Sequence, residues 1–376
     1  MKNNDRKLGD YIQPVDVRNS DLKVSHLLGL SIDKCFIESI ANTIGTDFRP
    51  YKIVKKGQFA YGPVTSRNGE KITIALLEEP ECIISSSYAV FEITDTSKLL
   101  PEYLMLWFSR PEFDRYARFK SHGSVREIFD WDEMCRVELP VPPLNEQQKI
   151  VDTYNAITNR IRIKQKINEN LEKTAQCLFE ELTKDKENFE TKTIEEISDA
   201  VICGKTPSTT ESKYWGNEIP FITIPDMHGS NFIHTTERYL SIAGKQSQEK
   251  QTLPPNSICV SCIATVGLVS LTTTESQTNQ QINSIICKKG ISFYYVFMLL
   301  KQMTDELKRL GAGGSTTLNV SKSLFASIKL QLPNEENMTI FNKKVSQLFS
   351  KILINEKEIE KLESLKQIVN SQVSKR

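Results

Sequence analysis

The sequence predicts an α+β fold in which two similar globular domains alternate along the chain with two long helices. Three observations in the 376 residues carry this prediction. One segment recurs later in the chain, two long polar stretches carry apolar residues at coiled-coil spacing, and the remaining regions mix short β-patterned runs with amphipathic helix.

The internal repeat is a match between two distant segments. GSVREIFDWDEMCRVELPVPPLNEQQKIV begins at Gly123, and GSTTLNVSKSLFASIKLQLPNEENMTIF begins at Gly314, 191 residues later. At this offset VEL falls on IKL, and Pro142 falls on Pro333. The chain therefore consists of two copies of one structural plan.

The two polar stretches keep the same offset and carry apolar seams with a 4,3 spacing. Both seams have a period of 3.5 residues and run for about four heptads with charged residues between, which is typical of coiled-coil helices. The alternative is two amphipathic surface helices packed on separate domains, but the shared phase favours a pair. The seam residues are Ile150, Tyr154, Ile157, Ile161, Leu171 and Leu178 in the first stretch and Phe341, Val345, Leu348, Ile352, Ile359 and Leu362 in the second.

The prolines of PVPPLNEQQKIV fix where the first helix begins. They force an extended approach, so we expect a helix over about 144–183 with Asn145 as its N-cap, and a second helix over about 335–373. At about 1.5 Å per residue the first helix is roughly 60 Å long and needs a partner. Antiparallel pairing would bring together Lys164 and Asn355, which hold matching mid-seam positions, and they are expected to fix the register.

Each globular region shows β-patterned runs followed by a helix. The first has runs at 51–54, 71–77 and 82–93 and a helix over 101–119, and the second has runs at 219–224, 256–272 and 281–287 and a helix over 294–310. The predicted division is therefore a first domain over 1–142, a first helix over 143–185, a second domain over 186–333 and a second helix over 334–376.

Composition places the chain among ordinary globular proteins. Hydrophobic residues make up 39% and charged residues 25%, and there is no apolar run of 18 residues and no apolar segment near the start. We therefore expect no membrane span, no secretory signal, and a cytoplasmic protein with reduced thiols. A net charge of +1 means that a nucleic-acid binder would need its cations gathered on one face.

No pattern for catalysis or metal binding stands out. Cys259-Val-Ser-Cys262 has zinc spacing but lacks a second pair, and strand alternation places the two thiols on opposite faces, which suits burial. The GKT of 204–206 lacks the earlier glycine that a phosphate-binding loop requires, because that position is Asp199. We expect no catalytic residue, no metal ligand and no cofactor bound by this chain.

Two similar domains held apart by a rigid spacer suit the reading of two separated sites on DNA. Polar and basic loops supply the candidate contacts, since arginine pairs with guanine, asparagine or glutamine with adenine, and lysine with phosphate. The alternative to DNA contact is packing inside the protein for the aromatic side chains near these loops, which are Phe113, Tyr116, Phe119, Tyr214 and Trp215. Asn279 and Gln280 suit base reading and buried strand ties equally. The DNA-binding candidates are Arg67, Asn68, Lys120, His122, Ser124, Arg126, Lys205, Ser208, Lys213, Tyr214, Ser315 and Thr316.

Four motifs resemble the specificity subunit of type I restriction–modification systems. They are GKTPSTTESKYWGNEIPFITIPDMHG at 204–229, SCIATVGLVSL followed by TNQQI at 261–282, GSTTLNVS at 314–321 and VELPVPPLNEQQKIV at 137–151. The similarity spans essentially the whole chain. The second copy departs by reading LPNEENMTI in place of PPLNEQ, so its helix is expected to dock partners differently.

The resemblance implies two target-recognition domains separated by two antiparallel helices. Each domain would read one half of a bipartite, gapped double-stranded DNA site, and the helices would set the gap and dock the modification (methyltransferase) and restriction (ATP-dependent nuclease) subunits. Methyl donor and ATP would then be bound by those partners. The rival readings are a coiled-coil scaffold without a nucleic-acid role and a solitary DNA methyltransferase or nuclease.

Overall fold

The computed structural model describes residues 5–39, 43–66, 69–123, 126–184, 189–312 and 318–373. The chain divides into two compact units, one formed by Met1–Arg162 with Lys361–Arg376 and the other by Ile163–Glu360. Each unit combines strands and helices, which confirms the α+β prediction. Both long helices contribute residues to both units.

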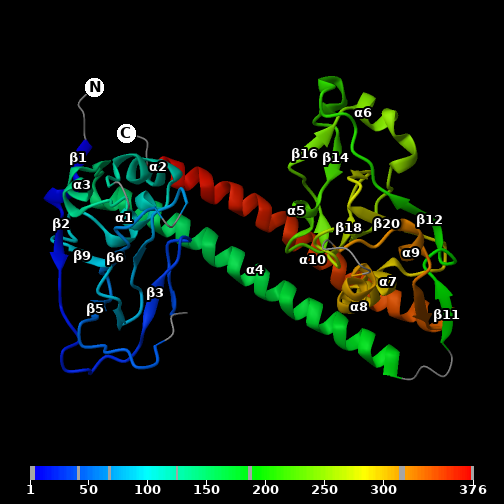
Figure 1. The fold of residues 1–376 in the computed structure, drawn as a ribbon, viewed down its shortest axis with the longest axis horizontal. Helices are drawn as coiled ribbons and strands as arrows, with labels where there is room; N and C mark the ends of the chain where they lie inside the picture. Colours follow the sequence, from blue (N-terminus) through cyan, green and yellow to red (C-terminus); the bar gives the residue numbers. More distant parts are fainter. Residues whose placement is uncertain are drawn as a thin grey trace. The chain divides into compact units, whose positions relative to one another are not determined.

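The first unit contains an antiparallel sheet with the strand order β2-β9-β6-β7 (Figure 1). Three two-stranded sheets accompany it, pairing β3 with β4, β5 with β8, and β1 with β10. The predicted run over 82–93 forms two strands rather than one. The strands are β1 Asp5–Lys7, β2 Ile12–Val15, β3 Leu28–Leu30, β4 Phe36–Glu38, β5 Lys52–Lys55, β6 Phe59–Tyr61, β7 Ile74–Leu76, β8 Glu81–Ile84, β9 Ala89–Ile93 and β10 Glu138–Pro140.

The helices of the first unit pack an aromatic core against the central sheet. They are η1 Leu8–Asp10, α1 Pro101–Phe108, α2 Pro111–Lys120 and α3 Trp131–Arg136. The single helix expected over 101–119 is wrong, because Arg110 is extended and Pro111, which has no N–H to donate, starts a new helix. Phe59 and Phe91 stack 4.9 Å apart at the centre of the core, and Phe108 packs edge-on against both.

The second unit contains a five-stranded sheet and a separate four-stranded sheet. Their orders are β12-β20-β17-β18-β15 and β13-β16-β14-β19, and β11 pairs with β21. The predicted run over 256–272 is interrupted by a turn at which Ala264 and Gly267 take positive φ. The strands are β11 Glu190–Thr193, β12 Ser198–Cys203, β13 Trp215–Gly216, β14 Ile219–Ile222, β15 Phe232–Ile233, β16 Arg238–Leu240, β17 Ile258–Ser261, β18 Val269–Thr272, β19 Gln277–Thr278, β20 Ile282–Cys287 and β21 Lys329–Leu332.

The helices of the second unit repeat the order seen in the first. The helix expected over 294–310 is again two helices, so α7, α8, α9 and β21 precede the second long helix as α1, α2, α3 and β10 precede the first. This confirms the duplicated order for these four elements, whereas α5 and α6 lie between strands of the second unit and no helix lies between β2 and β9 in the described part of the first. The helices are η2 Ser212–Tyr214, α5 Ile224–Met227, α6 Ile242–Ser247, η3 Glu249–Gln251, α7 Phe293–Gln302, α8 Thr304–Gly311 and α9 Lys322–Ala326.

The two long helices are α4 Leu144–Lys184 and α10 Glu335–Gln372, close to the predicted ranges. The N-cap expected at Asn145 is wrong, because the carbonyl of Pro143 already accepts from the backbone N–H of Gln147. In α10 the matching position is Asn334, whose side-chain oxygen accepts from the backbone N–H of Asn337. The second helix therefore begins one repeat length after the first, but the two helices have different N-caps.

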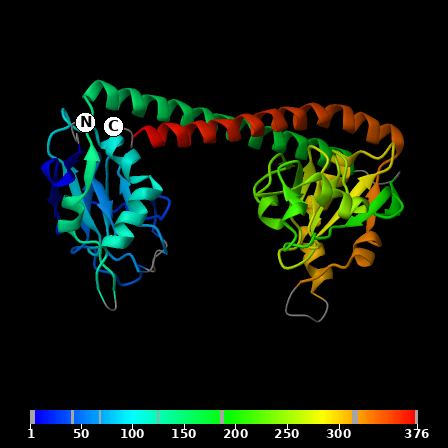
Figure 2. The ribbon, with the colours of Figure 1, turned by 90° about the horizontal axis from the view of Figure 1, so that it is seen from above.

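Within each unit the two helices pair antiparallel. In the second unit Phe179 of α4 contacts Phe341 of α10, while Lys164, earlier in α4, contacts Asn355, later in α10. In the first unit the end of α10 runs beside the beginning of α4 (Figure 2). There the Lys366 ammonium lies over the Tyr154 ring. Every predicted seam residue is buried or half-buried.

A polar network occupies the middle of the seam. Lys164 Nζ donates to Asn355 Oδ1 at 3.1 Å, which confirms that these residues meet, and it also pairs with Glu358 at 2.7 Å. Asn355 Nδ2 donates to Asn168 Oδ1 at 2.8 Å. Lys164 and Asn355 are 191 residues apart, which is the repeat offset, so they are equivalent positions of the two copies and contact each other in the helix pair.

Among the described parts of the chain, no helix combines the length and the hydropathy that crossing a bilayer requires.

Candidate nucleic-acid interface

In the first unit the loop after β6 and the loop after α2 are joined by hydrogen bonds. The hydroxyl of Thr65 donates to the Ser121 hydroxyl at 2.8 Å, and its backbone N–H donates to the carbonyl of Glu127 at 3.0 Å. His122 and Ile128 exchange backbone hydrogen bonds within the second loop. The structure therefore brings together two loops that no sequence motif connects.

These loops carry the basic candidates of the first unit. His122 and Arg126 are exposed, Lys120 is half-buried, and neither Lys120 nor Arg126 forms an ion pair with any residue in the described ranges. By contrast, Arg115 pairs with Glu112, and Arg118 pairs with Glu127. Cations without a carboxylate partner are the ones available to a phosphate or a base.

Two predicted placements on this segment need correction. Phe113 is buried and Tyr116 half-buried as expected, but Phe119 is 81% exposed, with the Lys120 ammonium 6.0 Å from its ring. The basic residues interleaved with these aromatics, Arg110 among them, were expected to line one side of the helix, but Arg110 is buried, and its guanidinium lies over the Trp107 ring. Pro111 restarts the helix between these residues, so one continuous helical face never forms.

A buried ion pair supports the loop after β6. Asp114 accepts from the backbone N–H of Ile72 at 3.1 Å and pairs with Lys34 at 2.8 Å, although burial lowers the pKa of Lys34. Lys34 also donates to the carbonyl of Phe108. The pair thus ties the β3–β4 hairpin, the base of α2 and the segment that follows residues 65–69 into one structure.

Five candidates lie outside the described residues, namely Arg67, Asn68, Ser124, Ser315 and Thr316.

In the second unit the GKT and TNQ motifs contact each other. Gly204 lies so close to Thr278 and Asn279 that a Cβ would approach their oxygens to 2.1 Å, which excludes any other residue there. The backbone N–H of Lys205 donates to the Thr278 carbonyl at 3.0 Å, and the Thr206 hydroxyl donates to Gln280 at 2.7 Å. Asn279 is thus a buried structural amide, whereas Gln280 is exposed, and the Lys205 side chain is left in solvent.

An open groove of about 460 Å³ lies beside β13 and β16. On one wall the guanidinium of Arg238 stacks on Trp215, with its carbon 3.6 Å from the ring centroid, and the Trp215 indole donates to the carbonyl of Ser208. The guanidinium of Arg238 makes no ion pair or hydrogen bond with the residues that the structure describes. The lining residues are Thr209, Ser212, Trp215, Gly216, Asn217, Glu237, Arg238 and Tyr239.

Stacking holds the guanidinium plane in place while its N–H groups remain available at the edge, which suits bidentate recognition of guanine. Lys213 and Tyr214 stand next to the groove, the former exposed and paired with Glu211, the latter half-buried. Sequence reasoning missed Arg238, because no motif marks it and its partner Trp215 belongs to another strand. The half-buried Trp215 bears out the packing alternative for that residue.

The three cations of α7 and α8 in the second unit all have partners. Lys301 donates to Asn231 at 2.8 Å, Lys308 pairs with Asp305, and Arg309 donates to the Asp305 carbonyl. The loop and groove side chains are therefore its better candidates for DNA contact.

The described residues contain no cluster of histidine, cysteine and carboxylate side chains suited to a metal ion. Cys259 and Cys262 are buried and face different parts of the core, as strand alternation predicts. Burial raises the pKa of Cys259 to about 12 and that of Cys262 to about 11, so both remain neutral thiols.

The glutamine of PPLNEQ has a structural role at the junction of the first domain with α4. Gln147 is fully buried; its Oε1 accepts from the backbone N–H of Leu100, and its Nε2 donates to the carbonyls of Lys98 and Pro142. The repeat-equivalent residue is Met338, buried in the apolar core of the second unit. The departure in the second copy therefore changes how a domain is fastened to its helix.

Comparison with known proteins agrees with this architecture. The family described as type I restriction modification DNA specificity domain matches residues 40–173 and 186–364. The specificity subunit of the type I restriction enzyme HindI from Haemophilus influenzae is 31% identical over 85% of this chain and 86% of its own length. The MjaIX specificity subunit from Methanocaldococcus jannaschii is 30% identical over 40% of this chain and 35% of its own.

A crystal structure of the type I restriction–modification S subunit from M. genitalium has the same fold. It superposes with a TM-score of 0.65 at 14% identity and covers 99% of this chain and 96% of its own. Two family matches in one chain correspond to the two copies of the repeat. The chain therefore belongs to the type I restriction–modification DNA specificity family and is a DNA sequence-recognition subunit.

Proposed function

We propose that the chain reads a bipartite, gapped site on double-stranded DNA. In this proposal residues 1–142 read one half-site and residues 186–333 the other, while the helical segments 143–185 and 334–376 set the gap. The observation that carries it is the duplicated domain together with a helix pair whose seam joins two residues one repeat apart, Lys164 and Asn355. A duplicated reader on a fixed spacer suits two separated sites on one duplex.

Contacts to DNA are assigned by the availability of each side chain. Lys120, His122 and Arg126 in the first domain and Lys205 in the second suit phosphates, and Lys213 would exchange its carboxylate partner Glu211 for a phosphate. Base edges suit side chains that present two hydrogen-bonding groups in one plane, as the stacked guanidinium of Arg238 does with two N–H donors. The remaining proposed contacts are Arg67, Asn68, Ser124, Ser208, Tyr214, Ser315 and Thr316.

Modification subunits are proposed to dock on the helix pair. Ile163 and Ile354 directly precede the bonded residues Lys164 and Asn355, and in an antiparallel pair such equivalent positions lie on the same side. Ile163, Ile167 and Ile354 are 47%, 40% and 56% exposed, an unusual state for three isoleucines so close together. Ile354→Asp should reduce co-purification with the modification subunit, and Ile242→Asp, at an exposed isoleucine of α6, should not.

Catalysis is proposed to reside on partner subunits, which would bind the methyl donor and, in the nuclease complex, ATP. The chain would act in the cytoplasm, where its DNA substrate lies.

The experiment is a genome-wide map of methylated adenines in the source strain, in a strain lacking this gene, and in that strain carrying the gene again. Loss and recovery of one gapped motif is the expected result. An unchanged map would remove the support for the reading role and favour the scaffold alternative.

Spacer length tests the role of the helices separately. One heptad added to both α4 and α10 lengthens the pair by about 10 Å, roughly three base pairs at 3.4 Å each. The gap should widen accordingly while both half-sites stay the same. Methylation that keeps the original gap in this variant would contradict the proposal.

A further inference from the structure

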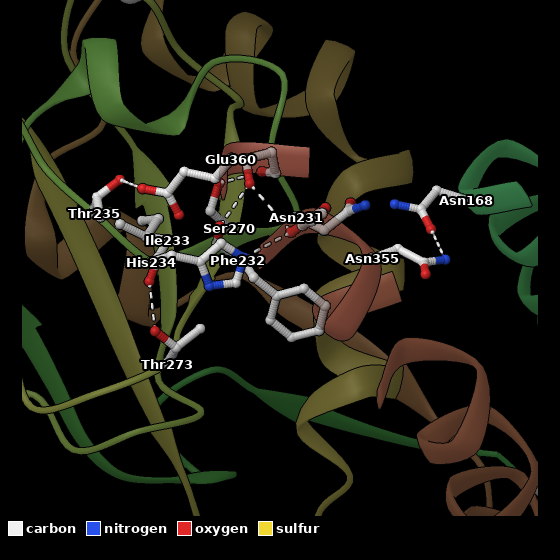
Figure 3. Close-up of polar contacts among 12 residues, drawn as sticks. Asn168, Asn231, Phe232, Ile233, His234, Thr235, Ser270, Thr273, Asn355 and Glu360 are labelled. Carbon is white, nitrogen blue, oxygen red and sulfur yellow. Dashed lines mark hydrogen bonds and ion pairs between the residues drawn. The ribbon is translucent and has the colours of Figure 1, made fainter. Parts of the chain in front are cut away.

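A group of helix carboxylates holds the segment 230–235 of the second domain. Glu356 Oε2 accepts from the Ser230 hydroxyl at 3.4 Å and lies 3.1 Å from His234 Nε2. Glu360 accepts from the Thr235 hydroxyl at 2.9 Å (Figure 3). On the other helix, Glu172 accepts from Asn231 Nδ2 at 2.9 Å, so both α4 and α10 grip the same six residues. We call these three carboxylates and their partners the latch.

The latch is shielded from water around Glu356, whereas the Glu172 side chain is 41% exposed and Thr235 is exposed. The side chains of His234 and Glu356 are only 11% and 17% exposed, and Asn231 is buried. Beneath the polar contacts, Phe232 packs edge-on against Phe349 of α10, and His234 stacks on Phe232. Hydrogen bonds to carboxylates in such surroundings are stronger than those at an open surface, and a lost partner leaves a buried charge unpaired.

Apart from the helix carboxylates, the segment is held by hydrogen bonds from the Ser270 and Thr273 hydroxyls, the backbone N–H of Leu271 and the ammonium of Lys301. Its strand β15 lies at the edge of the five-stranded sheet and pairs only with β18, at two positions. The chain then continues directly into β16, which carries Arg238 of the groove. The segment therefore lies between the helix pair and the groove along the chain.

The latch belongs to one copy of the repeat. At the offset of 191 residues, Glu356, Glu360 and Glu172 correspond to Gln165, Glu169 and Glu363, and all three of these are exposed. The first domain is fastened instead by the buried amide of Gln147. Glu169 and Glu363 keep a carboxylate at two of the equivalent positions but leave it exposed, so the contacts with the domain, and not the charges alone, distinguish the second copy.

We propose that Glu172, Glu356 and Glu360 are positioning residues that fix the second DNA-reading domain on the helix pair, and that they thereby restrict recognition to a single gap length. This inference rests on the proposed bipartite reading. The loops and the groove then determine which bases of the half-sites are read, and the latch determines how strictly a single gap length is required.

The test uses the full complex in a strain lacking the chromosomal gene. Methylated adenines are mapped for the wild type, for Glu172→Ala/Glu356→Ala/Glu360→Ala, for Glu356→Ala and for Glu356→Gln, which keeps an acceptor oxygen. The triple variant is expected to methylate sites with a gap one base pair longer or shorter at least tenfold more than the wild type, with both half-sites unchanged. Glu356→Ala should show a smaller rise, and Glu356→Gln should remain closer to the wild type.

Glu363→Ala is the matched control, because it removes an exposed carboxylate at the position equivalent to Glu172, and its gap should stay sharp. A triple variant that restores methylation only at the wild-type gap would overturn the inference, as would altered half-site bases with an unchanged gap. If the triple variant restores no methylation, Thr235→Val and Glu360→Ala decide by the same criterion. Failure of the wild-type gene to restore any gapped motif would instead reject the proposed function.

Discussion

Asn355 offers the most direct test of the polar centre of the helix pair. It is 1% exposed, accepts from Lys164 and donates to Asn168, itself buried. Asn355→Ala leaves the Asn168 oxygen in the seam without its donor, whereas Lys164 keeps Glu358 at 2.7 Å. A buried polar group left unpaired costs about 1–3 kcal/mol, so the helix pair of the second unit should lose about that much stability.

Native-state hydrogen exchange measures this loss where it occurs. A change of about 1–3 kcal/mol corresponds to a roughly 5- to 150-fold faster opening, expected at backbone amides around residues 160–172 and 350–360. The double variant Asn168→Leu/Asn355→Leu removes both amides and fills the seam with apolar side chains. Its exchange should return to within about 1 kcal/mol of the wild type, because replacing both partners leaves neither unpaired.

Two results would refute this reasoning. Unchanged exchange in Asn355→Ala would mean that the hydrogen bonds of Asn355 contribute nothing measurable. A double variant that opens as fast as the single variant would mean that the amides stabilise the pair directly, and that their role is not limited to the choice of register.

Four further predictions concern other parts of the chain. Asp114→Ala breaks a nearly buried ion pair with Lys34 and leaves the Ile72 N–H without its acceptor. The free energy of unfolding of the first unit, measured by urea, should therefore fall by about 3–5 kcal/mol. Asp132→Ala, at an exposed carboxylate, should change it little. Arg238→Ala should lower the methylation of sites that carry the preferred base at one position of a single half-site by about 5- to 150-fold. An equal loss of methylation whatever base stands there would mean that Arg238 binds phosphate. Thiol reagents at pH 8 should label Cys35 and Cys177 but spare Cys259, whose pKa burial raises from 9.0 to about 12. Because the folded Cys259 keeps its proton longer than the unfolded one, its contribution to stability is complete below pH 9 and is lost as the pH rises toward 12, which alkaline unfolding of Cys259→Ala against the wild type would measure.

Periodicity and repetition within the sequence were enough to predict the α+β class, the duplicated order of elements and both long helices. A heptad seam is a local pattern that repeats many times, so it survives errors at single positions. The meeting of Lys164 with Asn355 was predictable for the same reason, since antiparallel pairing of two seams with one phase leaves few registers. Helix ends and breaks were predicted less well, as Pro111 and the cap of α4 show, because each depends on a single residue.

Contacts between segments distant in sequence could be known only from the tertiary structure. Gln147 reads as an exposed helix residue until its amide is seen bonded to Leu100. Arg238 becomes a candidate only because Trp215, on a different strand, lies under it, and the latch exists only because β15 is folded against α4 and α10. The sequence determined the repeated plan and the helical spacer through short-range pattern, whereas the available cations and the fastening of each domain depend on side chains that meet only after the chain has folded.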